Sequence, residues 1–207
     1  IISESELFCL PLFCNFHCFC YLILLKPAKK KVHMLPLLFG IFQPGQNTIL
    51  SITGPQKDTK VQKKEKILGF WFNTKKMIYK KLPSLFFIAS SSPIKEILNY
   101  ESIIKEKLYF DELLINTVTQ RNFTEQKNLN EWGINLIKIK IDDNLYKEYK
   151  FNNIDDKLFQ TRVFFPANSI PGEYKVTIYQ VKDNVIVNKK KKIINIKKSG
   201  IGKVIYK

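Results

Sequence analysis

Few side chains in this 207-residue sequence have the types and spacing that catalysis or metal binding requires. The two histidines, His17 and His33, both lie in the N-terminal segment. The remainder of the sequence therefore has no histidine for a catalytic triad. The cysteines follow a C-x4-C-x3-C-x-C pattern, which is not a zinc-knuckle spacing and has no second ligand pair downstream. They are Cys9, Cys14, Cys18 and Cys20. The sequence therefore predicts no catalytic residue, no metal site and no cofactor.

The carboxylates and serines add no catalytic pattern. Asp142-Asp143 and Asp155-Asp156 are adjacent pairs, and adjacent residues point to different faces of a strand or helix. These pairs are therefore typical of turns and caps. Ser90 to Ser92 have no candidate base nearby, and the sequence contains no G-x-S-x-G, P-loop or G-x-G-x-x-G motif. We predict a non-catalytic protein; the alternative, an enzyme of unrecognised type, requires a deep pocket lined by converging polar residues.

The charge of the chain is strongly positive, with a formal net charge of +16. Arg121 and Arg162 are the two arginines among 34 basic residues, so 32 are lysine. Lysine is a solvated point charge, whereas arginine suits bidentate contacts with phosphates and bases. The composition thus favours a weak, diffuse contact with anionic lipid and disfavours a specific nucleic-acid role. The run from Lys189 to Lys192 is either a solvated sheet edge or a phosphate-binding patch.

Two parts of the chain differ in composition. Residues 1–35 comprise an apolar, cysteine-rich segment and a basic linker, and we expect them to lie outside the fold. Pro11 and Asn15 interrupt the apolar run, and Glu4 precedes it where a signal peptide has positive charge. A membrane-inserting segment, a signal-like region and non-coding read-through all remain as interpretations of this segment. Residues 36–207 are predicted to form a single domain.

Short β-prone runs separated by turn residues are typical of a β-sandwich or barrel. The polar run 56–66 predicts a hairpin arm, and 67–72 (ILGFWF) predicts a strand that ends at an Asn73-Thr74 turn. The pattern then changes to helical periodicity, with Ser92 as the expected N-cap. We therefore predict a mainly β fold, an immunoglobulin-like β-sandwich with a helical insertion at about residues 92–147.

The stretch 158–180 (LFQTRVFFPANSIPGEYKVTIYQ) predicts two alternating strands around a corner. In immunoglobulin-like sandwiches, a tyrosine near the start of the sixth strand hydrogen-bonds back across such a corner. Tyr174 has that position here, and an ordinary core aromatic is the other interpretation of it. The predicted structural corner consists of Pro166, Asn168, Pro171, Gly172 and Tyr174.

Residues 54–98 and 158–187 resemble the alphaproteobacterial putative transmembrane protein family of unknown function. The shared features are a Gly-Pro pair, an aromatic G-x-W pattern, a P-S…A-S-S-x-P segment and an L-F-x-T…P-A-N…P-G-x-Y ending. The positions here are Gly54, Pro55, Gly69, Trp71, Pro83, Ser84, Ala89, Ser90, Ser91, Pro93, Leu158, Phe159, Thr161, Pro166, Ala167, Asn168, Pro171, Gly172, Tyr174, Val176, Tyr179 and Asp183.

The resemblance implies a β-rich, periplasm-facing domain that is anchored in the inner membrane by one C-terminal helix. It also implies an accessory role beside a membrane protein partner such as a transporter, because family genes often adjoin a sulfite-exporter-like permease gene. The family has no known catalytic residues to carry over. No apolar run of spanning length follows residue 25, so we expect this chain to end before its anchor.

Overall fold

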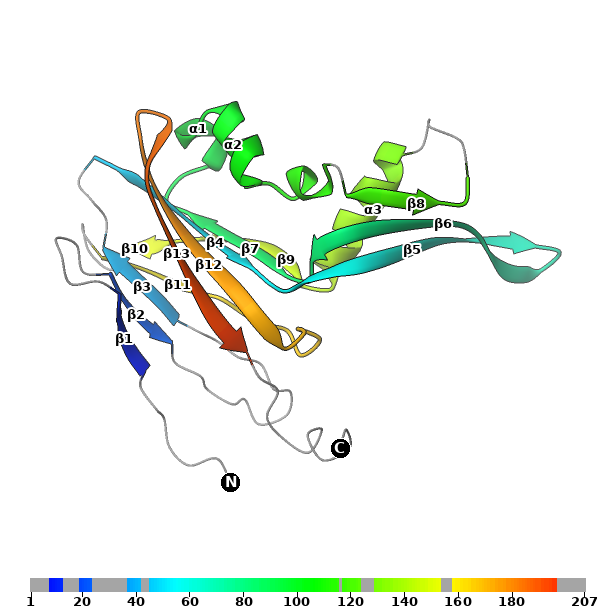
Figure 1. The fold of residues 1–207 in the computed structure, drawn as a ribbon, viewed down its shortest axis with the longest axis horizontal. Helices are drawn as coiled ribbons and strands as arrows, with labels where there is room; N and C mark the ends of the chain where they lie inside the picture. Colours follow the sequence, from blue (N-terminus) through cyan, green and yellow to red (C-terminus); the bar gives the residue numbers. More distant parts are fainter. Residues whose placement is uncertain are drawn as a thin grey trace, which may run out of the picture.

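The computed structural model describes residues 8–12, 19–23, 37–41, 45–115, 117–123, 129–153 and 158–196, and its centre is a five-stranded sheet (Figure 1). The strand order is β13 (Val185–Ile196), β12 (Gly172–Lys182), β4 (Asn47–Thr53), β7 (Phe86–Ser90) and β9 (Tyr146–Lys150). Neighbouring strands are antiparallel except β7 and β9, which are parallel.

The inner strands of the central sheet, β4, β7 and most of β12, are buried on both faces, whereas its edge strands β13 and β9 are largely exposed. Burial on both faces explains why β7 is a continuous apolar run and not an alternating one. Successive residues of β4 point to opposite faces, so Ile49 belongs to one hydrophobic cluster and Leu50 to the other. In the same way Phe86 and Phe87 of β7 face opposite clusters. One sheet therefore organises two cores.

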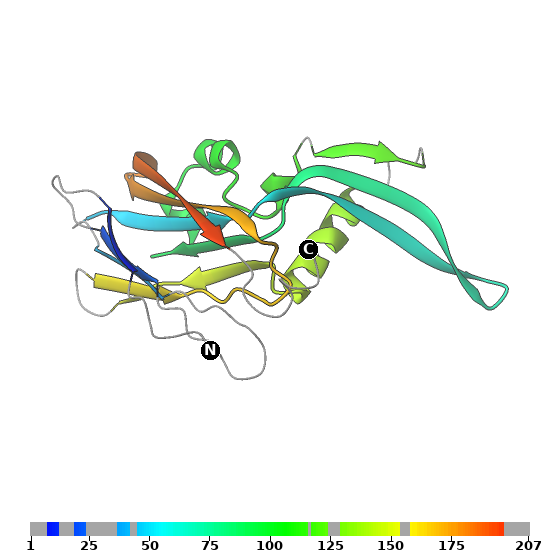
Figure 2. The same cartoon turned by 60° about the horizontal axis from the view of Figure 1, so that its bottom comes forward.

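The helical insertion covers one face of this sheet (Figures 1 and 2). Its elements are α1 (Ile94–Ile97), α2 (Tyr100–Glu106), the 3-10 helix η1 (Asp111–Leu114), strand β8 (Val118–Arg121) and α3 (Leu129–Asp142). The predicted insertion at 92–147 is confirmed, and β8 is an addition to it. The N-cap prediction at Ser92 is wrong, because Pro93 holds that position and makes no side-chain capping bond. Asn99 instead caps α2, accepting from the backbone nitrogen of Ser102 at 2.9 Å.

A second sheet covers the other face and completes the sandwich (Figure 2). Its order is β10 (Asn152–Asn153), β11 (Leu158–Arg162) and β3 (Leu37–Ile41). Val163 and Phe165, which follow β11, are buried against the central sheet in the second core. The fold is thus mainly β, a β-sandwich with a helical insertion. The immunoglobulin-like strand arrangement stays a prediction.

Strands β5 (Gln56–Ile67) and β6 (Phe70–Pro83) form a hairpin arm that projects from the body (Figure 1). The prediction of a turn at Asn73-Thr74 is wrong. The chain reverses at Leu68-Gly69, whose φ angles of 50° and 88° suit a two-residue hairpin turn. Thr74 is instead the extra residue of a bulge, because Lys63 pairs with Lys75 and Lys64 with Asn73.

Two further strand pairs are antiparallel. Strands β12 and β13 are joined by a tight turn at Asp183-Asn184, whose φ angles are 52° and 61°. Within residues 1–35, β1 (Phe8–Leu12) and β2 (Phe19–Ile23) pair antiparallel, and the domain boundary at residue 35 stays a prediction. The residues His17, His33, Cys14, Cys18, Asp155 and Asp156 lie outside the described residues.

Candidate functional site

Tyr174, in the predicted corner, is fully buried and its hydroxyl donates to the carbonyl oxygen of Ile170 at 2.6 Å. Its ring lies edge-on to Phe165, with centroids 5.5 Å apart. Burial raises the pKa of the Tyr174 hydroxyl, so the group stays protonated and able to donate. The geometry is that of a bond across a corner, four residues back along the chain.

The corner packs against the Gly54-Pro55 pair that follows β4. A Cβ on Gly54 would lie 2.8 Å from Ser84 Oγ and 3.0 Å from Tyr174 Cε1, so no larger residue fits without movement. A Cβ on Gly172 would meet Pro55 Cγ at 2.8 Å. The structure thus brings Gly172 and Tyr174 together with two residues more than 100 positions earlier. This contact gives the region a structural role.

The other members of the predicted corner are divided between core and surface. Pro166 is buried, whereas Asn168 and Pro171 are exposed. The backbone nitrogen of Ser169 donates to the carbonyl oxygen of Pro166 at 2.9 Å, which closes the turn between them. None of these contacts creates a concave site.

A charged cluster joins α2 to the edge strand β13. Glu106 forms an ion pair with Lys189, and the Tyr179 hydroxyl donates to Glu106 Oε2 at 3.1 Å. Burial, and then the charge of Glu106, raises the pKa of Tyr179. Tyr179 is therefore held in its neutral form, and the charge of Lys189 is balanced by Glu106. These contacts stabilise α2 against β12 and β13. Of the lysine run, Lys190 and Lys191 are exposed on the sheet edge, whereas Lys189 is half-buried.

Lys140 on α3 is a buried lysine, with 6% of its surface exposed. Its Nζ lies 5.7 Å from the centre of the Tyr146 ring, close enough for a cation–π contact. Burial lowers the pKa of Lys140, the charge of Lys57 lowers it further, and Asp143 opposes both. The Tyr146 hydroxyl is engaged elsewhere, donating to the carbonyl oxygen of Pro83 at 2.9 Å.

A cavity of about 520 Å³ lies where the arm meets the helical insertion. It is lined by Gln56, Lys80, Lys81, Ile104, Lys107, Glu112, Ile115 and Thr117. Among the described residues, Glu112 Oε2 is buried there without a hydrogen-bond partner. The Thr117 hydroxyl donates to the carbonyl oxygen of Leu114 at 2.7 Å and is not poised as a nucleophile. The lining favours a small polar or anionic occupant and lacks a nucleophile–base pair.

Sequence reasoning missed this cavity because its lining comes from separate elements that no motif links. Lys81 and Lys107 both adopt left-handed backbone, with φ angles of 53° and 52°. Lysine is not a residue type that predicts left-handed backbone from a sequence. The backbone nitrogen of Lys81 donates to Asp58 Oδ1 at 3.0 Å, which fixes the bulge at the base of the arm.

The tip of the arm is the most exposed apolar surface in the described part of the chain. Leu68 is 94% exposed, Phe70 71% and Trp71 68%. Ile67 and Phe72 beside them are also exposed. We call these residues, Ile67, Leu68, Phe70, Trp71 and Phe72, the arm tip. The sequence predicted a strand here but did not reveal that its aromatic side chains lie outside the core.

The fold and its sites define a β-rich domain with a projecting, apolar-tipped arm. The family model described as Putative transmembrane protein (Alph_Pro_TM) matches residues 37–207, and the chain belongs to this family. No catalytic fold or family is indicated by that match. No curated protein and no solved structure matches the chain.

The described residues do not meet the requirements for a membrane-spanning helix or for a metal site. None of their helices has both the length and the apolar character needed to cross a bilayer. They also contain no cluster of three or more histidine, cysteine, aspartate or glutamate side chains with the geometry to hold a metal ion.

Proposed function

We propose that this chain is a non-catalytic, periplasm-facing domain at the inner membrane that acts as an accessory to a membrane protein partner such as a transporter. The arm tip carries the proposal. It gathers five large apolar side chains at the end of a projection, where they contribute to neither hydrophobic core. An exposed apolar cluster of this kind is typical of a site that contacts a protein or a membrane.

The chemistry of the titratable groups supports an interaction role. Glu106, Lys189 and Tyr179 satisfy one another, and Lys140 packs over an aromatic ring. The Glu106 cluster stabilises α2 against β12 and β13, and the Lys140 ammonium is buried against a ring. Membership of a transmembrane family supports placement at a membrane.

A second candidate function is a basic module that binds anionic lipid or nucleic acid nonspecifically. The arm favours it, because residues 56–83 carry nine lysines and two acidic residues, a formal charge of +7. Binding of this kind weakens steeply as salt rises, since it depends on the release of counterions. Titration with duplex DNA and with anionic vesicles over a range of salt concentrations distinguishes it from a specific contact.

The partner proposal is tested by affinity capture from detergent-solubilised membranes, with the tagged chain and with a variant in which Phe70, Trp71 and Phe72 are serine. We expect one integral membrane protein to be enriched by the unaltered chain and recovered again when that protein carries the tag. The matched control is Ile134→Ser, which removes a side chain that is 63% exposed on α3. Recovery of abundant membrane proteins alone, equal for all three chains, would contradict the proposal.

A further inference from the structure

We propose that the arm tip inserts into the interfacial region of a bilayer that contains anionic lipids. The inference deepens the proposed function, because it identifies the surface that the arm contacts, and it rests on the placement of the chain at a membrane. Its two grounds are the two-sided arrangement of the apolar side chains and the lysines that follow them along the arm.

The tip presents apolar side chains on both faces of the hairpin. Residues directly opposite in an antiparallel pair share a face, and here Ile67 pairs with Phe70 and Lys66 with Trp71. Phe70 and Phe72 therefore lie on one face with Ile67, whereas Trp71 lies on the other. Leu68 occupies the turn itself. A groove on a folded partner covers one face of a hairpin, whereas a fluid apolar medium surrounds both.

The extent of the tip matches a shallow insertion. The last described contacts along the outer edge of β6 are those of Asn122 with Lys76 and Thr74. Between Thr74 and the turn no described strand joins β5 or β6, so the edges of the hairpin there expose backbone groups that need water or headgroups. Amphipathic segments lie about 5–10 Å into the headgroup and acyl boundary. At a rise of about 3.4 Å per residue, this depth takes two or three residues of each strand. The five residues of the tip fill that depth, and Trp71 is of the type that prefers the interface.

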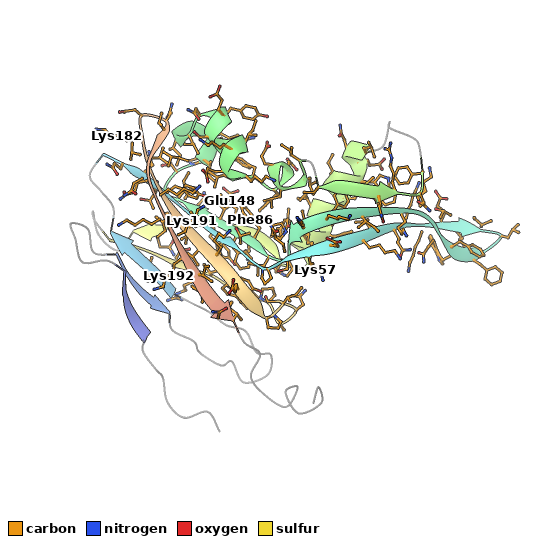
Figure 3. All side chains as sticks on the ribbon, in the orientation of Figure 1. Lys57, Phe86, Glu148, Lys182, Lys191 and Lys192 are labelled. Atoms are coloured by element: carbon orange, nitrogen blue, oxygen red, sulfur yellow. The ribbon has the colours of Figure 1, made fainter. Side chains whose placement is uncertain are left out.

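Lysines begin where the apolar residues end. Lys64 and Lys66 of β5 lie opposite Asn73 and Trp71 of β6, and Lys75 and Lys76 follow on β6. Side chains project along both strands of the arm, with Lys57 at its base (Figure 3). Lysine stems extend along apolar surface while their ammonium groups stay among the headgroups. Each lysine near an anionic surface strengthens binding by about five-fold, and salt screens this contribution.

The experiment measures binding of the full chain to vesicles of phosphatidylglycerol and phosphatidylethanolamine, and to vesicles of phosphatidylcholine alone. We expect binding to the anionic vesicles with a blue shift of tryptophan emission and quenching by brominated acyl chains. Trp132 is buried in the body, so Trp71 is the tryptophan placed to respond. The Trp71→Phe variant should keep most of the binding and lose the spectral change.

Paired variants compare the arm tip with exposed apolar side chains elsewhere on the surface. Changing Phe70, Trp71 and Phe72 to serine should weaken partition by at least about ten-fold, since these side chains supply most of the inserted apolar area. Tyr100→Ser and Ile134→Ser, at positions 69% and 63% exposed elsewhere, should leave partition unchanged. Circular dichroism confirms that each variant is folded.

Several outcomes would overturn the inference. One is binding to the anionic vesicles with neither a blue shift nor quenching of tryptophan emission, which is adsorption by charge alone. Another is a serine variant that binds vesicles as well as the unaltered chain. A third is a chain that ignores vesicles yet loses its captured protein when the tip is changed, which places the tip in a protein groove and leaves the accessory function standing. Vesicle insertion without any captured partner would instead retain the inference and refute that function.

Discussion

Replacing Tyr174 with phenylalanine tests whether the corner hydrogen bond stabilises the fold. The substitution removes one oxygen, keeps the ring against Phe165, and leaves the carbonyl oxygen of Ile170 without its donor at 2.6 Å. Because Tyr174 has no exposed surface, the ring burial is the same in both chains. The difference between them isolates the hydroxyl.

The expected loss in the free energy of unfolding is about 1 kcal/mol. A typical hydrogen bond contributes about 0.5–1.5 kcal/mol net, because the unfolded chain replaces it with bonds to water. The bond is partly buried, so water reaches the freed carbonyl and keeps the loss near the centre of that range. For a domain of this size, a loss of this magnitude lowers the Tm by about 2–4 °C.

Urea unfolding followed by circular dichroism measures the loss as a lower midpoint with an unchanged slope. Tyr100→Phe is the matched control, since Tyr100 is 69% exposed and should show no change. A loss below about 0.3 kcal/mol would refute the reasoning and leave Tyr174 as an ordinary core aromatic, because a buried donor bond is worth at least about 0.5 kcal/mol.

Two further substitutions probe the same body. Gly54→Ala places a Cβ 2.8 Å from Ser84 Oγ and 3.1 Å from the backbone nitrogen of Leu85, so we expect overpacking to cost about 1–3 kcal/mol in urea unfolding, and an unchanged midpoint would contradict the tight contact. Lys140→Met should raise the free energy of unfolding at neutral pH, because burial lowers the pKa of Lys140 below its ordinary 10.5 and the unfolded chain binds that proton more tightly. The gain should shrink as the pH rises towards 10.5, where the unfolded lysine also loses its proton; a gain that is constant with pH would indicate packing alone.

Features set by local periodicity could be predicted from the sequence. The change to helical periodicity predicted a helical insertion at about residues 92–147, and the structure has α1, α2, η1 and α3 within those residues. Asp183 and Asn184 are residue types that tolerate left-handed backbone, and they form the β12–β13 turn. In each case the residue types within a short stretch of sequence are enough to specify the element.

Features that depend on distant contacts could not be predicted in this way. The parallel pairing of Phe86 with Tyr146 joins residues 60 positions apart, and no turn signal specifies it. The cavity at the base of the arm combines Gln56 with Lys107 and Thr117, and no local pattern relates these residues. Both arise from how the insertion folds back over the sheet.

The arm tip shows why β propensity fails to locate a core. Residues 67–72 and Phe86–Ser90 are similar apolar runs, yet the second is buried throughout and the first is exposed. Aromatic and β-branched residues favour strands in either setting, since propensity reports fit to a pleated surface and not its burial. What separates the two runs is context: Leu68-Gly69 reverses the chain within the first run, and lysines surround it.

The position of the arm tip outside the cores also means that its substitution should affect vesicle binding and not the stability of the fold. The two cores draw on β4, β7, β9, β12, the insertion, the segment after β11 and the base of β6, where Met77, Tyr79 and Leu82 are buried. Neither core includes a residue of the arm tip. Changing the tip therefore removes no core contact, and surface substitutions of this kind alter stability by about 0.5 kcal/mol or less. A variant of Phe70, Trp71 and Phe72 that loses vesicle binding while keeping its urea midpoint has lost a contact with the membrane and not its fold. Because the arm tip lies outside both cores, substitutions there can change membrane binding without changing the free energy of unfolding.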